Sequence, residues 1–312
     1  MVHMTLAPAH RRHAATHHGV FTLEQARALG ASDDRIAHAR RTGELVHPRR
    51  GVLVFAGLAA AYEQAVAIVC AAHPFAVASH RTAGRLLALR RLGPVEDVEV
   101  TVPGRCSVRS AGLVVHHTKL LPRSHVVERA DGIRHTTPVR TVFDLASVLG
   151  DDAPESIIEQ VLDRGLATVG TLMAMGRLMR ERGRNGSARF GHVLASRPAW
   201  RRPANSDLEV RVDQALRRLG MAPGVRRPTV VLGDGTKIEP DLWWPDLRLA
   251  VEIDHVTWHG GRLDAQYDKA RDRKVGRLGV ETVRITDADI RGDIWSAVGD
   301  VVAIAALRRP AA

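Results

Sequence analysis

Aromatic side chains, cysteine and long apolar runs are all scarce in this sequence of 312 residues. Aromatic residues make up only 4% of the chain, so base stacking on an aromatic platform is not expected as a main binding mode. Two cysteines, Cys70 and Cys106, exclude a disulfide framework in a chain of this size. The longest apolar stretch, residues 58–72, is interrupted by Glu63 and Gln64 and is too short to span a bilayer. Since no run typical of a signal peptide opens the sequence, we expect a cytoplasmic protein with no membrane partner.

Positive charge, in contrast, is abundant and unevenly placed. The formal net charge is +11, yet residues 206–312 hold 17 basic and 17 acidic residues and are neutral. The whole excess lies in residues 1–205, which hold 28 basic against 17 acidic residues. A basic surface attracts phosphate backbones, so we expect DNA, or alternatively RNA, as a partner. A genome that favours arginine over lysine would give the same excess without such a partner.

The length of the chain predicts more than one hydrophobic core, and its Gly- and Pro-rich stretches suggest where the cores are separated. We expect an α/β multidomain protein with domains at 1–57, 58–203 and 204–312. The first is predicted as a winged helix, the second as a mixed α+β domain and the third as an α/β domain.

The first domain has the element order of a winged helix-turn-helix. Thr22 with Gln25 three residues later predicts a capping box at the start of a short helix, and Ser32 can cap a second helix. A β-hairpin with its turn over residues 48–51 follows. The second helix of such a fold enters the major groove of DNA. The basic residues expected at the nucleic acid are Arg35, Arg40 and Arg41 on this helix and Arg49 and Arg50 at the wing tip. A small interaction module with a solvated arginine face is the alternative.

The middle segment shows no catalytic constellation. Helices are expected over 62–72 and 80–89 and, as a group, over 141–194, with strands over 98–102, 113–117 and 133–137. The neighbours His116 and His117 point to opposite faces of a strand and cannot bind one metal together.

Four features of the first two segments occur in one order: a winged-helix pattern over 19–55, the run SHRTA at 79–83, a strand over 98–103 and the stretch 131–146. In this combination the segments resemble the AbiEi-type antitoxin family of abortive-infection systems. In that family the N-terminal domain binds DNA and represses its own operon, which the resemblance implies here.

The last segment is predicted as a helix over 206–219, strands over 229–232, 237–244 and 248–254, a helix over 263–278, a strand over 282–285 and a helix over 290–307. Three carboxylates stand out in it. Glu252 and Asp254 share the polar face of the strand 248–254. A tight hairpin over 245–248 would bring Asp241 opposite Glu252, with the two Cβ atoms about 5 Å apart. Because like charges packed this closely need a cation, we expect the three carboxylates to bind Mg²⁺ or Mn²⁺. Such an ion can supply hydroxide for phosphodiester hydrolysis.

The pair Pro240-Asp241 followed by Glu252-Ile253-Asp254 resembles the motif of the PD-(D/E)xK nuclease superfamily. More narrowly, the stretch 241–259 is similar to the branch of very-short-patch repair endonucleases. The resemblance covers residues 204–312 and implies a restriction-endonuclease-like α/β domain. The residues to which it assigns catalytic roles are Asp241 and Glu252 as metal ligands, Asp254 beside the metal or its water, His259 at the scissile phosphate and Glu209 in a supporting position.

One departure from that motif matters most: Asp254 stands where the superfamily usually carries lysine. The basic residues that could replace it are His259, Lys269, Arg273 and Lys274, and the sequence leaves the choice open. Lys269 and Lys274 also fit ion pairs along a solvated helix face. A second departure is His255, where close relatives often carry glycine.

Three functions remain open on the sequence alone. The first is a Mg²⁺-dependent endonuclease that cuts DNA in phage defence, a toxin–antitoxin system or repair. The alternative is an AbiEi-type DNA-binding transcriptional regulator or antitoxin with a catalytically degenerate nuclease fold. The third is a fused effector that acts on RNA or nucleotides. A homodimer or a cognate toxin–antitoxin partner is compatible with these functions.

Overall fold

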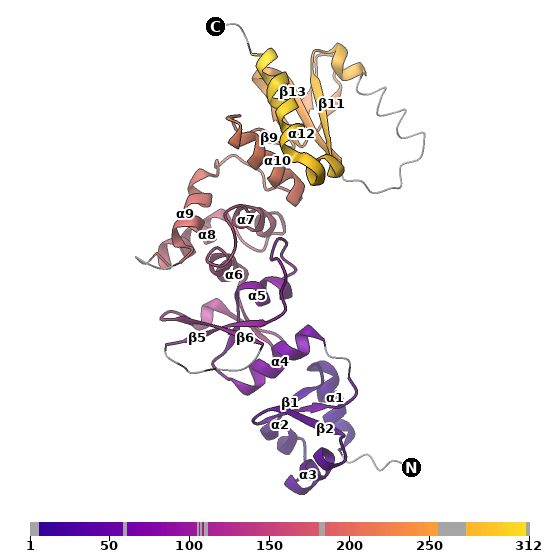
Figure 1. The fold of residues 1–312 in the computed structure, drawn as a ribbon, viewed down its shortest axis with the longest axis vertical. Helices are drawn as coiled ribbons and strands as arrows, with labels where there is room; N and C mark the ends of the chain where they lie inside the picture. The colour runs from indigo at the N-terminus through magenta and orange to yellow at the C-terminus, as the bar shows by residue number, and fades with distance from the viewer. Residues whose placement is uncertain are drawn as a thin grey trace. The chain divides into compact units, whose positions relative to one another are not determined.

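The structure, a computed structural model, describes residues 6–58, 61–104, 106, 108, 112–180, 185–254 and 273–309. Contacts within the chain divide it into two compact units. Unit 1 comprises residues 1–149 and 171–190, and unit 2 comprises residues 150–170 and 191–312. Figure 1 shows the elements of both units. The predicted boundaries at residues 57 and 203 are not tested by this grouping and stay a prediction.

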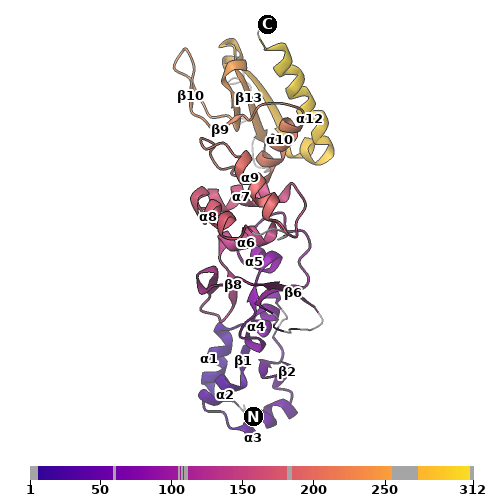
Figure 2. The same cartoon turned by 90° about the vertical axis from the view of Figure 1, so that its left-hand side faces the viewer.

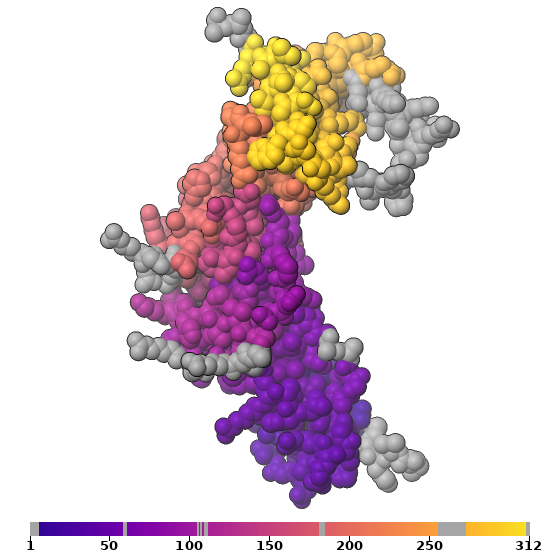
Figure 3. All heavy atoms as spheres, viewed as in Figure 1, coloured from indigo at the N-terminus to yellow at the C-terminus, as the bar shows by residue number. Residues whose placement is uncertain are grey.

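The N-terminal part of unit 1 is a winged helix with a three-stranded sheet in the order β1-β3-β2. Its core is one apolar cluster that includes Phe21, Ile36, Leu53 and Phe55. Figure 3 shows one face of this region in indigo, with all heavy atoms drawn. Its elements are α1 (Pro8–Thr16), β1 (Val20–Thr22), α2 (Leu23–Ala28), α3 (Asp33–Arg41), β2 (Leu45–Arg49) and β3 (Val52–Phe55).

Local sequence signals account for most of this region. The Thr22–Gln25 capping box forms in full, and the Ser32 side chain accepts a hydrogen bond from the Arg35 backbone N–H, so both predicted helix starts are confirmed. Helix α1 was not expected from the sequence. It begins with Pro8 in its first turn, and His10 anchors it through a 3.0 Å hydrogen bond between its Nε2 and the Ala26 carbonyl oxygen.

The turn of the wing is shorter than predicted. Strand β2 runs through Pro48 to Arg49, so that only Arg50 and Gly51 lie between β2 and β3. Proline has no N–H to give to a ladder and is tolerated at an edge strand or a bulge. Strand β2 is the edge of its sheet, and its pairing is irregular between Val46 and Arg49, so Pro48 fits inside it.

The rest of unit 1 is built on a five-stranded mixed sheet in the order β6-β5-β4-β8-β7. Strands β5 and β6 are parallel, and their apolar side chains pack in a second core cluster around Val66 and Val100. The helix predicted over 62–72 and the three predicted strands are confirmed. The elements are α4 (Tyr62–Ala72), β4 (Val77–Ala78), α5 (His80–Leu86), β5 (Val98–Pro103), β6 (Leu113–Thr118), η1 (Arg123–His125), β7 (Val126–Glu128), β8 (Arg134–Thr136) and α6 (Pro138–Leu145). Helices α8 (Val169–Leu178) and α9 (Ser187–Ser196) each cross from one unit into the other.

Unit 2 is a four-stranded sheet in the order β14-β13-β12-β9 with the helices α10 and α12 side by side (Figures 1 and 2). Strands β13 and β14 are parallel, whereas β12 and β13 are antiparallel. Its elements are α7 (Ala153–Asp163), α10 (Asp207–Arg218), β9 (Val225–Arg226), β10 (Val230–Val231), β11 (Lys237–Ile238), β12 (Leu242–Trp244), η2 (Pro245–Leu247), β13 (Leu249–Asp254), β14 (Glu281–Thr286) and α12 (Asp287–Leu307).

The single strand predicted over 237–244 is wrong, because it divides into β11 and β12, which belong to different sheets. Pro240 lies at the break, where a residue without an N–H cannot continue a ladder. The helix predicted over 263–278 lies for the most part outside the described residues.

Buried ion pairs join α7 to the remainder of unit 2. Arg226 on β9 is completely buried and lies 2.9 Å from Glu159 on α7 and 3.5 Å from Asp213 on α10. Arg197 and Arg201 reach the same two carboxylates. Since an uncompensated charge in the interior is costly, these pairs explain why α7 belongs to unit 2 although it precedes most of it in sequence.

Among the helices of the described residues, none combines the length and the apolar character needed to cross a membrane.

Candidate nucleic-acid interface and acidic site

Helix α3 presents its basic side chains on the surface of the winged helix. Ile36 and Ala39 are its buried positions. At 3.6 residues per turn, Arg41 lies on the side of the helix opposite those two residues, and Arg35 and Arg40 flank them on either side. All three arginines are exposed. Their placement agrees with the expectation that this helix carries basic groups outward.

The wing adds two more basic side chains near its tip. Arg50 is exposed in the turn, and Arg49 is half-buried at the end of β2. Burial lowers the pKa of Arg49, but a guanidinium still keeps its charge at neutral pH. Gly51 has a φ of +78°, a conformation that residues with a Cβ rarely adopt, so the tight turn requires glycine here. The wing therefore holds two cations at the end of a hairpin with a two-residue turn.

The acidic site of unit 2 forms around β12 and β13. Leu242 pairs with Val251, so the register extended by one residue places Asp241 opposite Glu252, as predicted. The Oδ2 of Asp241 also accepts a hydrogen bond of 2.7 Å from the Ile253 N–H on the neighbouring strand. That bond ties the carboxylate to the backbone of β13.

Glu209 on α10 lies beside this carboxylate. It is 3% exposed, and its Oε2 accepts a hydrogen bond of 3.3 Å from the Asn205 N–H. Burial raises its pKa, and the negative charge of Asp241 raises it further. The Ser206 hydroxyl accepts a hydrogen bond from the Glu209 N–H, so the residue also serves the start of α10. Glu209 thus lies in the first turn of α10 and next to Asp241 at once.

Arg284 supplies a counter-charge that was not anticipated from the sequence. It lies on β14 directly beside Glu252, because the parallel register pairs these two residues. Its guanidinium is 3.1 Å from a Glu252 oxygen and 3.8 Å from an Asp254 oxygen. Among the described residues, the three carboxylates do not form a group whose ligand atoms all lie within 4.8 Å of one another. The metal site predicted at these carboxylates stays a prediction, and Arg284 supplies positive charge to two of its three acids.

The structure describes two of the four other residues predicted at this site. His259 and Lys269 lie outside the described residues. Arg273 is exposed, and Lys274 makes an ion pair of 3.2 Å with Asp234. Asp234 lies in a turn outside the helix of Lys274, so this ion pair is not the one predicted along the helix face, which stays a prediction.

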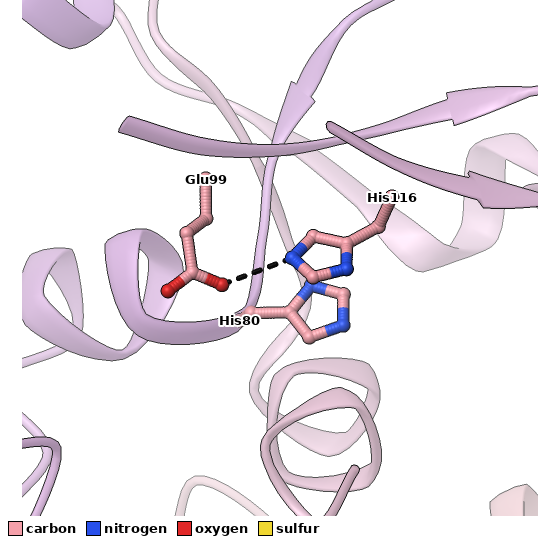
Figure 4. Close-up of side chains that lie close together, drawn as sticks. All are labelled: His80, Glu99 and His116. Atoms are coloured by element: carbon pink, nitrogen blue, oxygen red, sulfur yellow. Dashed lines mark hydrogen bonds and ion pairs between the residues drawn. The ribbon is translucent and has the colours of Figure 1, made fainter. Parts of the chain in front are cut away.

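A second cluster of polar side chains, in unit 1, was missed from the sequence. His80 at the start of α5, Glu99 on β5 and His116 on β6 place their ligand atoms within 4.8 Å of one another (Figure 4). Within the part of the chain that the structure describes, this is the group of three that fits a metal ion. From the sequence, His116 was considered only together with its neighbour His117, which points to the opposite face of a strand. The parallel register of β5 and β6, which brings Glu99 and His116 to one face, follows a loop and cannot be read from local spacing.

The winged helix is the part of the chain that matches a known family. Residues 11–56 match the family described as "Transcriptional regulator, AbiEi antitoxin". Two curated relatives from Mycobacterium tuberculosis, both named as uncharacterised proteins (MT2308 and Rv2248), are 41% identical over 51 residues. The match spans 16% of this chain and 19% of the length of those proteins. The N-terminal region is therefore similar to AbiEi-type transcriptional regulators, and the match ends before the carboxylates of unit 2.

One solved structure is also similar. The crystal structure of the Rv2827c protein from Mycobacterium tuberculosis aligns with a TM-score of 0.39 and 19% identity, over 60% of this chain and 76% of that one.

Proposed function

We propose that this chain is a DNA-binding transcriptional regulator of antitoxin type. The observation that carries the proposal is the winged helix over residues 11–56, which matches an AbiEi regulator family and exposes basic side chains on α3. Arg41 faces away from the core, so it would read base edges, while Arg35 and Arg40 would hold the phosphates on either side. The proposal includes a cognate toxin protein as a second partner.

The wing supports the same function. Arg49 and Arg50 extend the positive surface beyond the helix, and each phosphate that they neutralise releases counterions. Two further phosphate contacts would make binding salt-dependent without adding sequence preference. The excess charge of residues 1–205 also favours association with DNA.

The test is a binding titration with a duplex that the full-length protein has selected from a random pool. Arg41→Gln should weaken binding and reduce discrimination against mismatched duplexes. Arg50→Gln should weaken binding to all duplexes alike and lower the slope of log K against log salt by about 0.9. Arg291→Gln on α12 removes an exposed charge of the same kind from unit 2 and should change neither quantity. Equal binding by all three variants and the wild type would overturn the proposal.

A second candidate function is metal-dependent phosphodiester cleavage by a nuclease fold of the PD-(D/E)xK type. The observation that favours it is the placement of Asp241 opposite Glu252 with Glu209 next to it. Mg²⁺ or Mn²⁺ would have to displace Arg284 from Glu252 and Asp254. In this candidate the winged helix delivers the nuclease to DNA.

Incubation of the full-length protein with Mg²⁺ or Mn²⁺ and labelled single- and double-stranded DNA and RNA tests this second function. Metal-dependent cleavage should disappear in Asp241→Asn and Glu252→Gln and persist in Glu239→Gln, an acid of the same segment outside the site. If no substrate is cut while binding to the duplex is retained, the nuclease candidate is rejected and the proposal of a DNA-binding regulator is kept.

A further inference from the structure

We infer that His80, Glu99 and His116 form a binding site for a divalent transition-metal ion of the Zn²⁺ type. This site goes beyond the proposed function and is independent of it. Two imidazoles and one carboxylate are a ligand set that Zn²⁺ accepts, and in sites of this kind a fourth position is left to water or a small anion. Figure 4 shows the three side chains gathered together, with the His116 ring next to both of the others.

The spacing of the ligand atoms suits one small ion. Ligands about 2.0–2.2 Å from a tetrahedral ion lie roughly 3.3–3.6 Å from one another. The His116 Nε2 and the Glu99 Oε2 are 3.0 Å apart, joined by a hydrogen bond in the metal-free arrangement. The ring centroids of His80 and His116 are 3.5 Å apart, with 19° between the ring planes. The rings must rotate out of this stacked arrangement for the lone pairs of both to point at one ion.

Neighbouring groups fix the orientation of the ligands. The Nδ1 of His80 is 2.9 Å from the Ser79 hydroxyl oxygen, which also accepts a hydrogen bond from the Thr101 hydroxyl. When Nδ1 donates to Ser79, the Nε2 lone pair is free for a metal, which is the arrangement usual for metal-binding histidines. The other oxygen of Glu99 accepts a hydrogen bond of 3.2 Å from Arg81. Arg81 is in turn held by the backbone carbonyl of Val148 at 2.7 Å.

The protonation states of two of the side chains are compatible with a metal. Burial, followed by the neighbouring His116, Arg140 and Arg81, lowers the pKa of His80 to about 2, so its ring is uncharged at neutral pH and one of its nitrogens carries a lone pair. Burial acts to raise the pKa of Glu99, but hydrogen bonds from His116 and Arg81 outweigh it and keep the carboxylate charged. A metal binds ligands in these forms, and His80 and Glu99 already have them at neutral pH.

The backbone holds His80 in an unusual conformation. Its φ is +47°, in the left-handed region, although the residue is a histidine and only 5% exposed. Such a conformation costs about 1–3 kcal/mol and tends to occur where a side chain must be aimed. Here it directs the ring toward β5 and β6.

Solvent can reach the site. His80 and His116 line a cavity of about 510 Å³ in unit 1, together with Lys119 and Arg140. An ion bound by the two imidazoles would thus have a face open to water or an anion, as catalytic zinc sites do. Glu99 is 5% exposed and is not among the residues that line this cavity.

The test uses the full-length protein freed of metal with a chelator and then titrated with Co²⁺, whose visible absorption reports four-coordinate binding. One equivalent should bind and be displaced by Zn²⁺. His116→Gln and Glu99→Gln should each weaken binding at least tenfold, while His117→Gln, the neighbouring exposed histidine, should not. His13→Gln/His17→Gln removes another stacked histidine pair and should also retain the site.

Circular dichroism must show that each variant is folded. If the variants of the buried residues unfold, NMR of the wild-type protein is the alternative measurement. The imidazole nitrogen signals of His80 and His116 should shift on addition of one equivalent of Zn²⁺. The inference is overturned if no Co²⁺ spectrum develops, if His116→Gln and Glu99→Gln bind as the wild type does, or if Zn²⁺ leaves those two ring signals unchanged. None of these outcomes depends on DNA binding, which is measured separately with the same preparations.

Discussion

The Arg226 Nη1 lies 2.9 Å from the Glu159 Oε2 in unit 2, and the two side chains are 0% and 1% exposed. Removal of one partner leaves the other buried and uncompensated, which typically costs about 3–5 kcal/mol. Glu159→Ala should lower the free energy of unfolding of unit 2 by this amount, measured by urea denaturation. Glu281→Gln removes an exposed partner 3.8 Å from Arg308 and should cost about 1 kcal/mol or less. Similar losses in both variants would contradict the prediction.

A substitution at the wing should affect stability through the backbone alone. Gly51 has a φ of +78°, and a Cβ added there would meet no atom within 4 Å. Gly51→Ala should therefore destabilise the winged helix by about 1 kcal/mol through strain. Gly150→Ala is the control, because Gly150 also has open space around it but no positive φ. Thermal denaturation distinguishes the two.

Stability should fall with acid pH because of His80. Its folded pKa of about 2 is below the unfolded value of 6.5, so between these two values the unfolded state binds a proton that the folded state does not bind. The contribution of His80 to the free energy of unfolding is complete above pH 6.5. It is lost as the pH falls toward 2, by up to about 1.4 kcal/mol per pH unit. His80→Gln should flatten this dependence relative to the wild type. An unfolding free energy of the wild type that stays constant from pH 7 to 5 would contradict the prediction.

Glu209 should behave in the opposite sense. Burial and the charge of Asp241 raise its folded pKa, so its favourable contribution is complete below the unfolded value of 4.5 and is lost as the pH rises through the folded one. Glu209→Gln removes the buried charge and keeps an oxygen for the Asn205 N–H. We expect a gain on the order of 1 kcal/mol at neutral pH that vanishes near pH 4. Urea unfolding at both pH values measures it, and an equal effect at both would argue against charge as the cause.

Local signals in the sequence predicted the winged helix well. The Thr22 and Ser32 caps, the hairpin and the outward arginines depend on residues a few positions apart, which is where such patterns are informative. The register of Asp241 with Glu252 was also predictable, because a short turn fixes the pairing of the strands that it joins.

Two features could not be predicted for the same physical reason. Arg284 meets Glu252 through a parallel pairing with β14, and His116 meets Glu99 through a parallel pairing of β5 with β6. A parallel pairing needs a long connection, and nothing near either strand specifies the register. In both pairs, the second residue lies on a strand whose position the local sequence pattern does not determine.

The position of helix α7 limits where recombination can divide the gene for this chain. Its residues belong to unit 2, while residues 171–190, which come later in the sequence, belong to unit 1. No single uninterrupted piece of the gene encodes unit 2 alone, so recombination that joins residues 204–312 to another protein would leave Arg226 without Glu159 and Asp213 without Arg201. We therefore expect recombination to transfer the coding sequences of the two units together and not as separate, exchangeable modules.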